Sequence, residues 1–441
     1  MAKKQTHEVF GVSNEVLPDS YVDRGALDAQ VRGYLKRPTH VALRGASKCG
    51  KSWLRQTVLP EAVTVQCRLK KTTLDIYIDA LSQLEVKLIL EESKGSSLKG
   101  RVETSGDLGI KLLARLGVKT AVEAEKQGGK KSQAVGHDVT DLRFVADIIK
   151  ESGKRLVIED FHYLSVEERR VFAFDLKALW DYGVFVVIIG VWSEQNLIQF
   201  LNPDLSGRVL EVPIVWQEAD LRMIFTSGGV ALNLEFSDEI QSRAIADCFE
   251  NSGILQTLTL GTLDEVGITE SQGEHTVVDD LNALESAAMV YADQLNSLYQ
   301  LFAKRVSGGI RTRTNSTGIY AHAMAAILDA SDDVLIQGLS IDQIYSVAHE
   351  REERIQKGNL HTVLERLEGL QVDDEGRGLV LAYNEADREV SVVDRQLLLY
   401  RKYSTVKWPW EDLIAEANKD EQFEADTAQL EMQMYDGSAE A

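Results

Sequence analysis

The stretch that decides the fold is Gly45-Ala46-Ser47-Lys48-Cys49-Gly50-Lys51-Ser52, which matches the pattern G-x-x-x-x-G-K-[ST] at every fixed position. Residues 39–44 before it predict a short buried strand, and residues 53–58 after it predict the start of a helix. This is the context that a phosphate-binding loop requires, and it argues against a glycine turn that matches the pattern by chance. The sequence therefore predicts an α/β fold that binds a nucleoside triphosphate.

Each residue type in the loop has a physical reason. Backbone N–H groups have to wrap the phosphates, and Gly45 and Gly50 leave the room and the positive φ that this requires. Lys51 would place its ammonium on the β- and γ-phosphates and Ser52 its hydroxyl on Mg²⁺, at the positive end of a helix. We expect the nucleotide to contact the whole loop and the residue after it: Gly45, Ala46, Ser47, Lys48, Cys49, Gly50, Lys51, Ser52 and Trp53.

The composition of the chain is that of a globular protein with more than one domain. Its 441 residues are 44% hydrophobic and 27% charged, and this length suggests about two or three domains. The net charge of −21 would repel a nucleic-acid backbone if it were spread evenly. Any contact with nucleic acid therefore has to come from local basic patches.

Cysteine usage and hydropathy indicate the compartment. Cys49, Cys67 and Cys248 show no C-x-x-C spacing, which argues against a disulfide framework and against a zinc site. No apolar stretch of about 18 residues occurs, and the first residues form no apolar leader. We therefore expect a cytoplasmic protein that has no membrane partner.

A second candidate site lies in residues 155–164. Leu156, Val157 and Ile158 predict a buried central strand, and the carboxylates of Glu159 and Asp160 stand at its end. Ligands bind at the carboxyl ends of parallel strands, so both carboxylates would face the phosphates and the Mg²⁺ held by the loop. The sequence thus predicts a Walker B motif.

The two motifs, together with Tyr21-Val22-Asp23-Arg24 before an amphipathic helix, resemble the ATPases of the AAA+ superfamily and the related STAND regulators and origin-recognition-type initiators. The resemblance implies ATP and Mg²⁺ as ligands and a parallel P-loop sheet followed by a helical lid. It also implies that Arg24 lines the base pocket. The alternative for Arg24 is a surface arginine at a helix start.

The resemblance assigns roles to the carboxylates. In the family an Asp orients the metal and a following Glu polarises the attacking water, whereas here the order is Glu-Asp. We expect Glu159 to act mainly on Mg²⁺, with Ser52, and Asp160 to act on the water. The reversed order leaves this division open and favours slow hydrolysis.

Two further positions follow from the same resemblance. A polar residue after the most apolar strand, Ser193 or Asn196, would sense the γ-phosphate. Arg208 resembles the arginine finger that reaches the nucleotide of an adjacent subunit, and its alternative is a local salt bridge. The predicted catalytic residues are Lys51, Glu159, Asp160 and Arg208.

We divide the chain into five segments. Residues 1–216 form the nucleotide-binding core, 217–274 the lid, 275–313 a long heptad-patterned helix and hinge, 314–402 a winged helix and 403–441 an acidic tail. Within the core, a basic insert at about 94–136 is a candidate contact for nucleic acid, a partner or a neighbouring subunit, or else a solvated loop. Within these segments the sequence pattern predicts a helix over 73–90, a linker over 260–274, a hinge over 304–313 and a short strand at 370–372. The heptad seam, which runs from Val277 to Phe302, could pair with another subunit or pack on its own domain.

Two functional hypotheses result. The first is an oligomerising AAA+/STAND-like switch that binds and hydrolyses ATP and signals to a protein effector, with bacterial phage defence as one setting. The second is a DNA-binding initiator or loader that uses its winged helix on duplex DNA. A third hypothesis is a degenerate P-loop protein that has no activity and serves as a scaffold.

Overall fold

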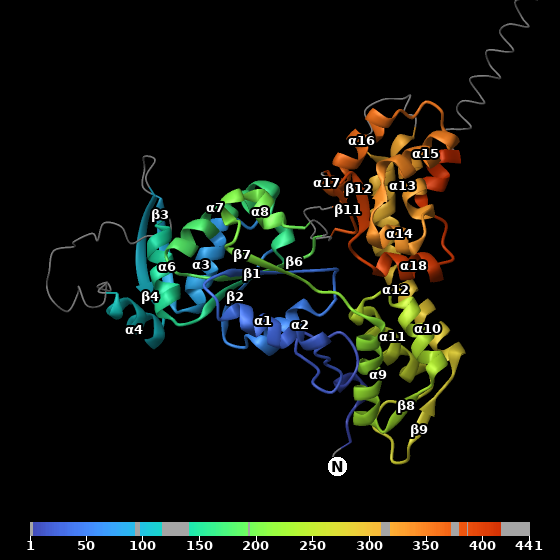
Figure 1. Ribbon diagram of the computed structural model, residues 1–441, viewed down its shortest axis with the longest axis horizontal. Coiled ribbons are helices and arrows are strands. Elements are labelled where there is room, and N and C mark those ends of the chain that lie inside the picture. The colour runs from blue at the N-terminus through green and yellow to red at the C-terminus, as the bar shows by residue number, and fades with distance from the viewer. Residues whose placement is uncertain are drawn as a thin grey trace, which may run out of the picture. The chain divides into compact units, whose positions relative to one another are not determined.

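The computed structural model describes residues 3–92, 98–116, 141–192, 195–309, 318–371, 379–385 and 387–415. The chain divides into two compact units (Figure 1). The first unit comprises Met1–Glu235, Glu250–Gly253 and Gln272–His275, and the second comprises Phe236–Phe249, Ile254–Ser271 and Thr276–Ala441.

A five-stranded parallel sheet forms the centre of the first unit. Its order is β2-β5-β6-β1-β7, so the P-loop strand β1 lies between β6 and β7. The strands are β1 (His40–Arg44), β2 (Ala62–Gln66), β5 (Arg155–Glu159), β6 (Val186–Gly190) and β7 (Val209–Pro213). Every residue of β6 is buried, as a central parallel strand covered on both faces requires. The predicted α/β fold with a parallel P-loop sheet is confirmed.

Helices cover both faces of this sheet. In Figure 1, α1 and α2 lie on one side of the sheet, and α3, α6, α7 and α8 lie on the other. The helices of this unit are α1 (Leu27–Leu35), α2 (Lys51–Val58), α3 (Thr73–Gln83), α4 (Asp107–Arg115), α6 (Leu142–Glu151), α7 (Val166–Asp181), α8 (Leu197–Leu201) and α9 (Glu218–Leu232), with short 3₁₀ turns at Thr6–Glu8, Arg24–Ala26, Phe161–Tyr163 and Pro203–Leu205. The arrangement is a three-layer sandwich.

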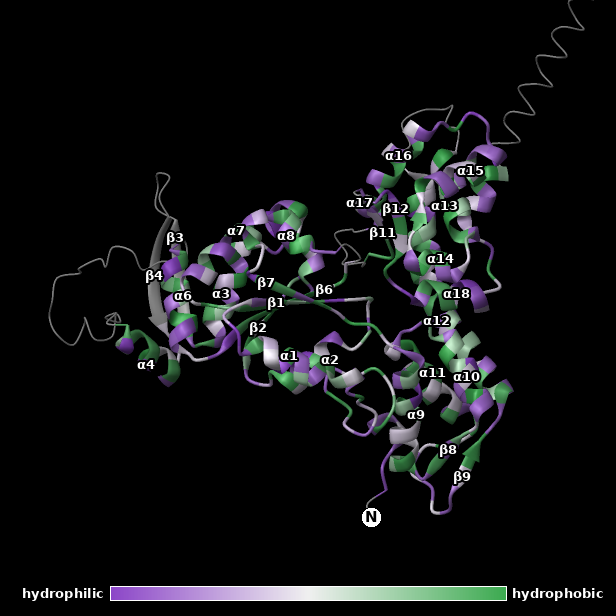
Figure 2. Ribbon diagram, in the orientation of Figure 1, coloured by the Kyte–Doolittle hydropathy of each residue, from purple (hydrophilic) through white to green (hydrophobic). Residues whose placement is uncertain are grey.

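The pattern of apolar residues accounts for these layers. Helix α6 is strongly amphipathic and buries Phe144, Val145 and Ile148 against the core. Figure 2 shows the central strands coloured as hydrophobic, with mixed colours along the covering helices. Helix α7 begins where the Ser165 hydroxyl accepts the Glu168 N–H, a typical N-cap contact.

His40 is the least expected residue of the buried sheet. Its side chain is fully buried; Nε2 lies 3.0 Å from the carbonyl oxygen of Leu176, and Nδ1 accepts the N–H of Val186 at 2.9 Å. Only a neutral imidazole can donate from one nitrogen and accept at the other. Burial lowers the pKa of His40 to about 4.

The region that follows α3 differs from the prediction. Residues 84–90, which the sequence pattern predicted as a continuing helix, instead begin the strand β3 (Val86–Glu92), which pairs antiparallel with β4 (Leu98–Thr104). Helix α3 ends at Gln83, and Glu85 then takes a φ of 61°, which a helix cannot accommodate. Of the basic insert, residues 98–116 therefore hold a strand and a helix, while 93–97 and 117–140 lie outside the described residues.

The second unit is mostly helical. Strand β8 (Leu234–Phe236) spans the boundary between the units, and α11 (Ser252–Glu265) begins in the first unit. The other elements are α10 (Asp238–Asp247), β9 (Thr276–Val278), α12 (Leu281–Gly308), α13 (Ile319–Asp329), α14 (Asp332–Gln337), β10 (Leu339–Ser340), α15 (Ile341–Arg351), α16 (Lys357–Glu365), α17 (Leu367–Gln371), β11 (Leu381–Asn384), β12 (Glu389–Val392) and α18 (Gln396–Tyr403). Strands β10, β12 and β11 form an antiparallel sheet in that order.

Three local predictions for this part are wrong. The linker expected from residue 260 onward begins only after Glu265, because α11 continues that far. Residues 304–308, expected to be a hinge, complete the helix α12. Gln371, expected in a strand, belongs to α17, where its side chain hydrogen-bonds to the backbone of Leu381.

The heptad seam of α12 packs within its own unit. Leu284, Ala288 and Leu295 are buried. The hydroxyl of Tyr299 donates to Asp394 at 2.9 Å, and the side chain of Asn296 accepts the Tyr400 hydroxyl at 2.6 Å. Most of the seam therefore packs on its own domain, whereas Val277 and Leu281 at its start are exposed.

No helix in the described ranges is both long enough and apolar enough to cross a lipid bilayer.

Candidate functional site

The P-loop has the backbone geometry that its glycines predict. A Cβ at Gly45 would lie 2.9 Å from Cys49 Sγ and 3.0 Å from the carbonyl oxygen of Ile214, so this position has no room for a side chain. Gly50 adopts a φ of 86° and precedes the first residue of α2. Here the reason for glycine is conformation, because the nearest atom to a Cβ would be 3.5 Å away.

The Lys51 side chain folds back over its own loop. Its Nζ donates to the carbonyl oxygens of Gly45 at 3.0 Å and Ala46 at 2.5 Å, and lies 3.7 Å from Cys49 Sγ. The residue is only 8% exposed. The ammonium is thus held inside the loop, where a bound phosphate would meet it.

Arg24 lies against the P-loop and is not a surface residue. The side chain is 5% exposed, Nη1 donates to the carbonyl oxygen of Cys49 at 3.1 Å, and the guanidinium stacks 4.5 Å from the ring centroid of Trp216. Trp216 Nε1 donates to the same carbonyl at 2.9 Å. Burial lowers the pKa of Arg24. The expected helix-capping alternative does not describe this contact.

A second segment far away in the sequence also reaches the loop. Asn251 Nδ2 donates to the carbonyl oxygen of Ser47 at 2.7 Å, and the N–H of Gly253 donates to the carbonyl oxygen of Lys48 at 3.1 Å. Sequence reasoning assigned Asn251 and Trp216 no role, because each lies more than 150 positions from the loop and neither belongs to a motif.

The Glu159 carboxylate is engaged by the helix that follows the P-loop. Oε1 lies 3.0 Å from both Nε and Nη2 of Arg55 on α2, and both side chains are mostly buried. Glu159 is thereby placed beside the P-loop helix although β5 and β1 are separated by β6. Arg55 was not among the predicted site residues, because its spacing in α2 gives no motif.

Asp160 has a different partner. It adopts a φ of 55° directly after β5, and its Oδ2 accepts a hydrogen bond from Gln66 Nε2 at 2.8 Å. Asn and Asp tolerate this left-handed conformation better than other non-glycine residues do. The two carboxylates therefore have separate partners, Arg55 for Glu159 and Gln66 for Asp160.

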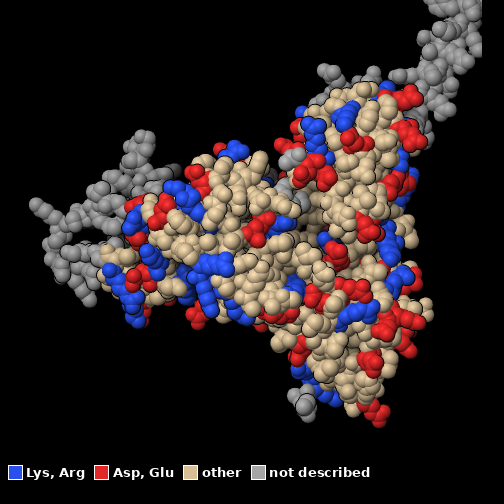
Figure 3. Space-filling model, in the orientation of Figure 1, with Lys and Arg blue, Asp and Glu red and all other residues tan. Residues whose placement is uncertain are grey.

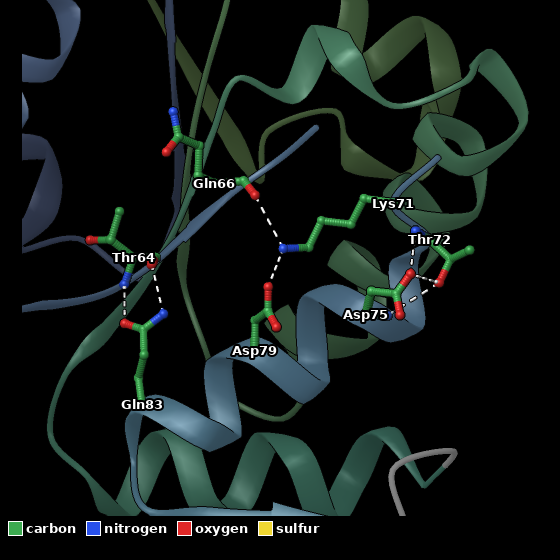
Figure 4. Close-up of polar contacts among 7 residues, drawn as sticks. All are labelled: Thr64, Gln66, Lys71, Thr72, Asp75, Asp79 and Gln83. Atoms are coloured by element: carbon green, nitrogen blue, oxygen red, sulfur yellow. Dashed lines mark hydrogen bonds and ion pairs between the residues drawn. The ribbon is translucent and has the colours of Figure 1, made fainter. Parts of the chain in front are cut away.

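The end of β2 that carries Gln66 is fixed by neighbouring side chains (Figure 4). Lys71 Nζ donates to the carbonyl oxygen of Gln66 at 3.1 Å and forms an ion pair with Asp79 of α3. Figure 4 shows the Gln66 amide pointing away from Lys71. The amide is therefore left for Asp160, while Lys71 holds the backbone.

His162, to which sequence reasoning assigned no role, lies near this edge. Its Nδ1 accepts the N–H of Val191, just after β6, at 3.3 Å. Burial, reinforced by the positive charges of Lys51 and Arg169, lowers the pKa of His162 to about 3. A neutral imidazole therefore lies within electrostatic reach of the P-loop ammonium.

Arg208 lies at the amino ends of the parallel strands, whereas the P-loop lies at their carboxyl ends. Its carbonyl oxygen accepts the N–H of His40, the first residue of β1, whereas the P-loop follows the last residue, Arg44. The five residues of β1 span about 15 Å between these two ends of the sheet. The guanidinium lies 4.8 Å from the ring centroid of Trp180 and donates to the carbonyl oxygen of Asp204. Arg208 is thus remote from its own P-loop.

Ser193 lies outside the described residues, so its predicted role stays a prediction.

The oxygen donors fit a small hard cation that is shared with phosphates. Ser52, Glu159 and Asp160 supply one hydroxyl and two carboxylates, and Mg²⁺ sites typically combine one or two carboxylates with phosphate oxygens and waters. In the described ranges no group of three or more His, Cys, Asp or Glu side chains could hold a metal ion by itself. The donor set therefore suits Mg²⁺ that arrives with a nucleotide.

No protein-family model matches the sequence, and no curated protein matches it well enough to count as a relative. Among solved structures, the chain is similar to the Orc1 protein of Aeropyrum pernix in complex with DNA, with 14% identity over 88% of this chain and 93% of that one and a TM-score of 0.40. It is also similar to a RuvB variant of Thermotoga maritima, with 12% identity over 86% and 93% of the two chains and a TM-score of 0.37.

A third similar structure is a STAND protein with a tetratricopeptide repeat sensor from Pyrococcus horikoshii. The identity is 12% over 95% of this chain, which spans only 47% of that protein, and the TM-score is 0.35. These structures are AAA+ P-loop ATPases, the class that the sequence resembles. Because the scores are low, the assignment of the fold rests on the strand order and the loop geometry.

Proposed function

We propose that this chain is an ATP-binding and slowly hydrolysing switch of the AAA+/STAND type. The observation that carries the proposal is the convergence of a P-loop, its buried Lys51 and the pair Glu159–Asp160 at the carboxyl edge of one parallel sheet. Ligands of open parallel sheets bind at this edge. The phosphate oxygens of a nucleotide would offer Lys51 stronger partners than the two loop carbonyls that it now contacts.

The residues of the chain divide the chemistry among them. Lys51 would exchange its carbonyl partners for phosphate oxygens, and Ser52 with Glu159 would hold Mg²⁺, which when bound neutralises phosphate charge. Asp160, oriented by the Gln66 amide, would accept the proton of the attacking water. Because Arg55 shares Glu159 with the metal, we expect slow turnover, which suits a switch better than a motor.

The remote position of Arg208 supports action in trans. It lies about 15 Å from the loop of its own subunit, too far for its side chain to reach a phosphate there. To act as a finger it would have to leave the Trp180 ring and reach the site of a neighbouring subunit. The proposed functional state is therefore a homo-oligomer with shared sites.

The second unit supports a signalling role through a winged helix. The helices α13, α15 and α16 with the sheet β10-β12-β11 have the element order of that module. On the face seen in Figure 3, acidic and basic side chains are intermingled over this unit, and Lys357 is paired with Asp342. A protein effector therefore fits this module better than duplex DNA, which favours a basic stripe.

Mixed-subunit kinetics test the proposal. Lys51→Ala and Asp160→Asn should each abolish ATP hydrolysis, and Arg208→Ala should reduce it, whereas Arg170→Ala, at an exposed arginine of α7, should leave it unchanged. Mixing the inactive Lys51→Ala protein with the Arg208→Ala protein should restore part of the activity. No restoration would exclude the trans role, and undiminished hydrolysis in all variants would reject the site.

The initiator hypothesis makes a different prediction. An initiator should bind duplex DNA with an affinity that falls steeply with salt, because phosphate contacts release counterions. A switch that signals to a protein should show no such binding.

A further inference from the structure

Five consecutive carbonyl groups of the P-loop each accept a hydrogen bond. Lys51 Nζ donates to the first two, the carbonyl oxygens of Gly45 and Ala46. The next three receive donors from outside the loop, namely Asn251 Nδ2 on Ser47, the N–H of Gly253 on Lys48, and both Arg24 Nη1 and Trp216 Nε1 on Cys49. The Ser47, Lys48 and Cys49 carbonyls are therefore oriented by groups outside the loop. Three distant segments of the first unit supply these groups.

The orientation of each carbonyl fixes the orientation of the next amide. A peptide unit is planar and trans, so the C=O of one residue and the N–H of the next point in opposite directions. Holding the Ser47, Lys48 and Cys49 carbonyls outward thus turns the N–H groups of Lys48, Cys49 and Gly50 to the other side of the loop. Successive N–H groups that point to one side form an anion-binding nest.

The conformation of Lys48 shows that this arrangement is imposed on the loop. Lys48 has a φ of 60°, a left-handed conformation that is sterically unfavourable for a non-glycine residue. Gly253 lies so close that a Cβ there would be 2.7 Å from Lys48 Cβ and from its carbonyl oxygen. The contacts with Asn251 and Gly253 offset the cost and hold Lys48 in this conformation.

We propose that Asn251, Arg24 and Trp216 are positioning residues that pre-orient the Lys48–Gly50 amides for the phosphates of a nucleoside triphosphate. This inference rests on the proposed function and deepens it. The three side chains donate to loop carbonyl oxygens, which point away from the amides that would bind phosphate. They raise the affinity for the polyphosphate part of the ligand by reducing the conformational freedom that binding would otherwise have to remove.

Asn251→Ala removes one of the three positioning side chains. The chain offers a closely matched control at Asn202. Asn202 is also buried, donates from Nδ2 to the carbonyl oxygen of Ala173 at 3.1 Å, and accepts the N–H two residues ahead with Oδ1. Asn251 makes the same pair of contacts, its Oδ1 accepting the Gly253 N–H at 2.9 Å. The two alanine variants therefore lose equivalent hydrogen bonds, and only one of them involves the P-loop.

The assay measures binding of inorganic tripolyphosphate and of ATP to the full chain by isothermal titration calorimetry. In Asn251→Ala, both affinities should fall by about tenfold, the effect of one lost hydrogen bond. The rate of hydrolysis at saturating ATP should stay within about twofold of the wild-type rate, because the positioning residues affect ligand binding. Asn202→Ala should leave both affinities unchanged while lowering the melting temperature.

Trp216→Phe provides a second variant in case Asn251→Ala does not fold. It keeps the ring beside Arg24 but loses the Nε1 donor, and it should also weaken tripolyphosphate binding. If folded Asn251→Ala and Trp216→Phe bind tripolyphosphate as tightly as wild type does, the inference is overturned and the proposed function is left intact. Equal losses in Asn251→Ala and Asn202→Ala would likewise overturn it. Failure of the wild type to bind either ligand would reject both proposals.

Discussion

Replacing His40 by glutamine removes an imidazole that has to stay neutral for the central sheet to form. Its two ring nitrogens join the start of β1 to α7 and to β6, through Leu176 and Val186. Burial lowers its pKa from 6.5 to about 4. The unfolded chain therefore takes up a proton at a higher pH than the folded chain does. The His40 contribution to stability is fully present above pH 6.5 and is lost as the pH falls towards 4.

The size of the effect follows from the two pKa values. At pH 7 nearly all His40 is neutral in both the folded and the unfolded chain. At pH 5 the difference between the two pKa values lowers the free energy of unfolding by about 2 kcal/mol. Wild type should therefore lose this amount between pH 7 and pH 5 through His40 alone. His40→Gln should be less stable at pH 7 by about 1–3 kcal/mol, because one of the two buried contacts is lost. Its further loss on going to pH 5 should be smaller than that of wild type by about 2 kcal/mol.

Equilibrium urea unfolding at both pH values measures the loss, and hydrogen exchange of β6 amides read by mass spectrometry assigns it to the sheet. His7→Gln, at an exposed position, controls for the substitution. The partly buried His162 remains in the variant and also destabilises the folded chain at low pH, because its pKa is lowered to about 3. If wild type and His40→Gln lose stability in parallel from pH 7 to pH 5, the buried neutral imidazole is not the cause.

Three further predictions concern packing and conformation. Gly50→Ala should cost about 1–2 kcal/mol through its φ of 86° alone, measured as a lower unfolding midpoint, together with weaker ATP binding. Leu295→Ala, in the buried seam of α12, should destabilise the second unit by about 2–5 kcal/mol in urea without changing the subunit number seen by light scattering; a change in subunit number would place the seam in an interface. Asp247→Asn should cost about 3 kcal/mol by thermal unfolding, because the fully buried carboxylate pairs with Lys402 and Arg243; a cost below about 1 kcal/mol would show that these pairs contribute little.

Local signals in the sequence were sufficient for the sheet and the P-loop. Short apolar runs predicted the parallel strands β1, β5 and β6, and the glycines at 45 and 50 have the geometry expected of them. The strand β3 was missed because the apolar residues from 84 to 90 also fit a helical spacing. The left-handed Glu85 that ends the helix has no signature in the sequence.

The candidate site was predicted only where a motif names its members. Arg55, Gln66 and Asn251 each contact a predicted site residue through one hydrogen-bonding side chain, and such contacts leave no periodicity or spacing along the chain. The position of Arg208 far from the P-loop follows from the parallel direction of β1 and β7. Arg208 directly precedes β7, whereas the P-loop directly follows β1.

The edge strand β2 has a consequence for how the chain is made. The side chain of Gln83 hydrogen-bonds both the N–H and the C=O of Thr64, at 3.1 Å and 2.7 Å, the groups drawn in Figure 4. Thr64 and Gln83 are 19 residues apart, whereas the strand that pairs with β2 begins only at Arg155. During synthesis from the N-terminus, this amide can cover part of the β2 edge before β5 has been translated. The nascent chain then leaves fewer backbone groups of this edge free for another nascent chain to add a strand.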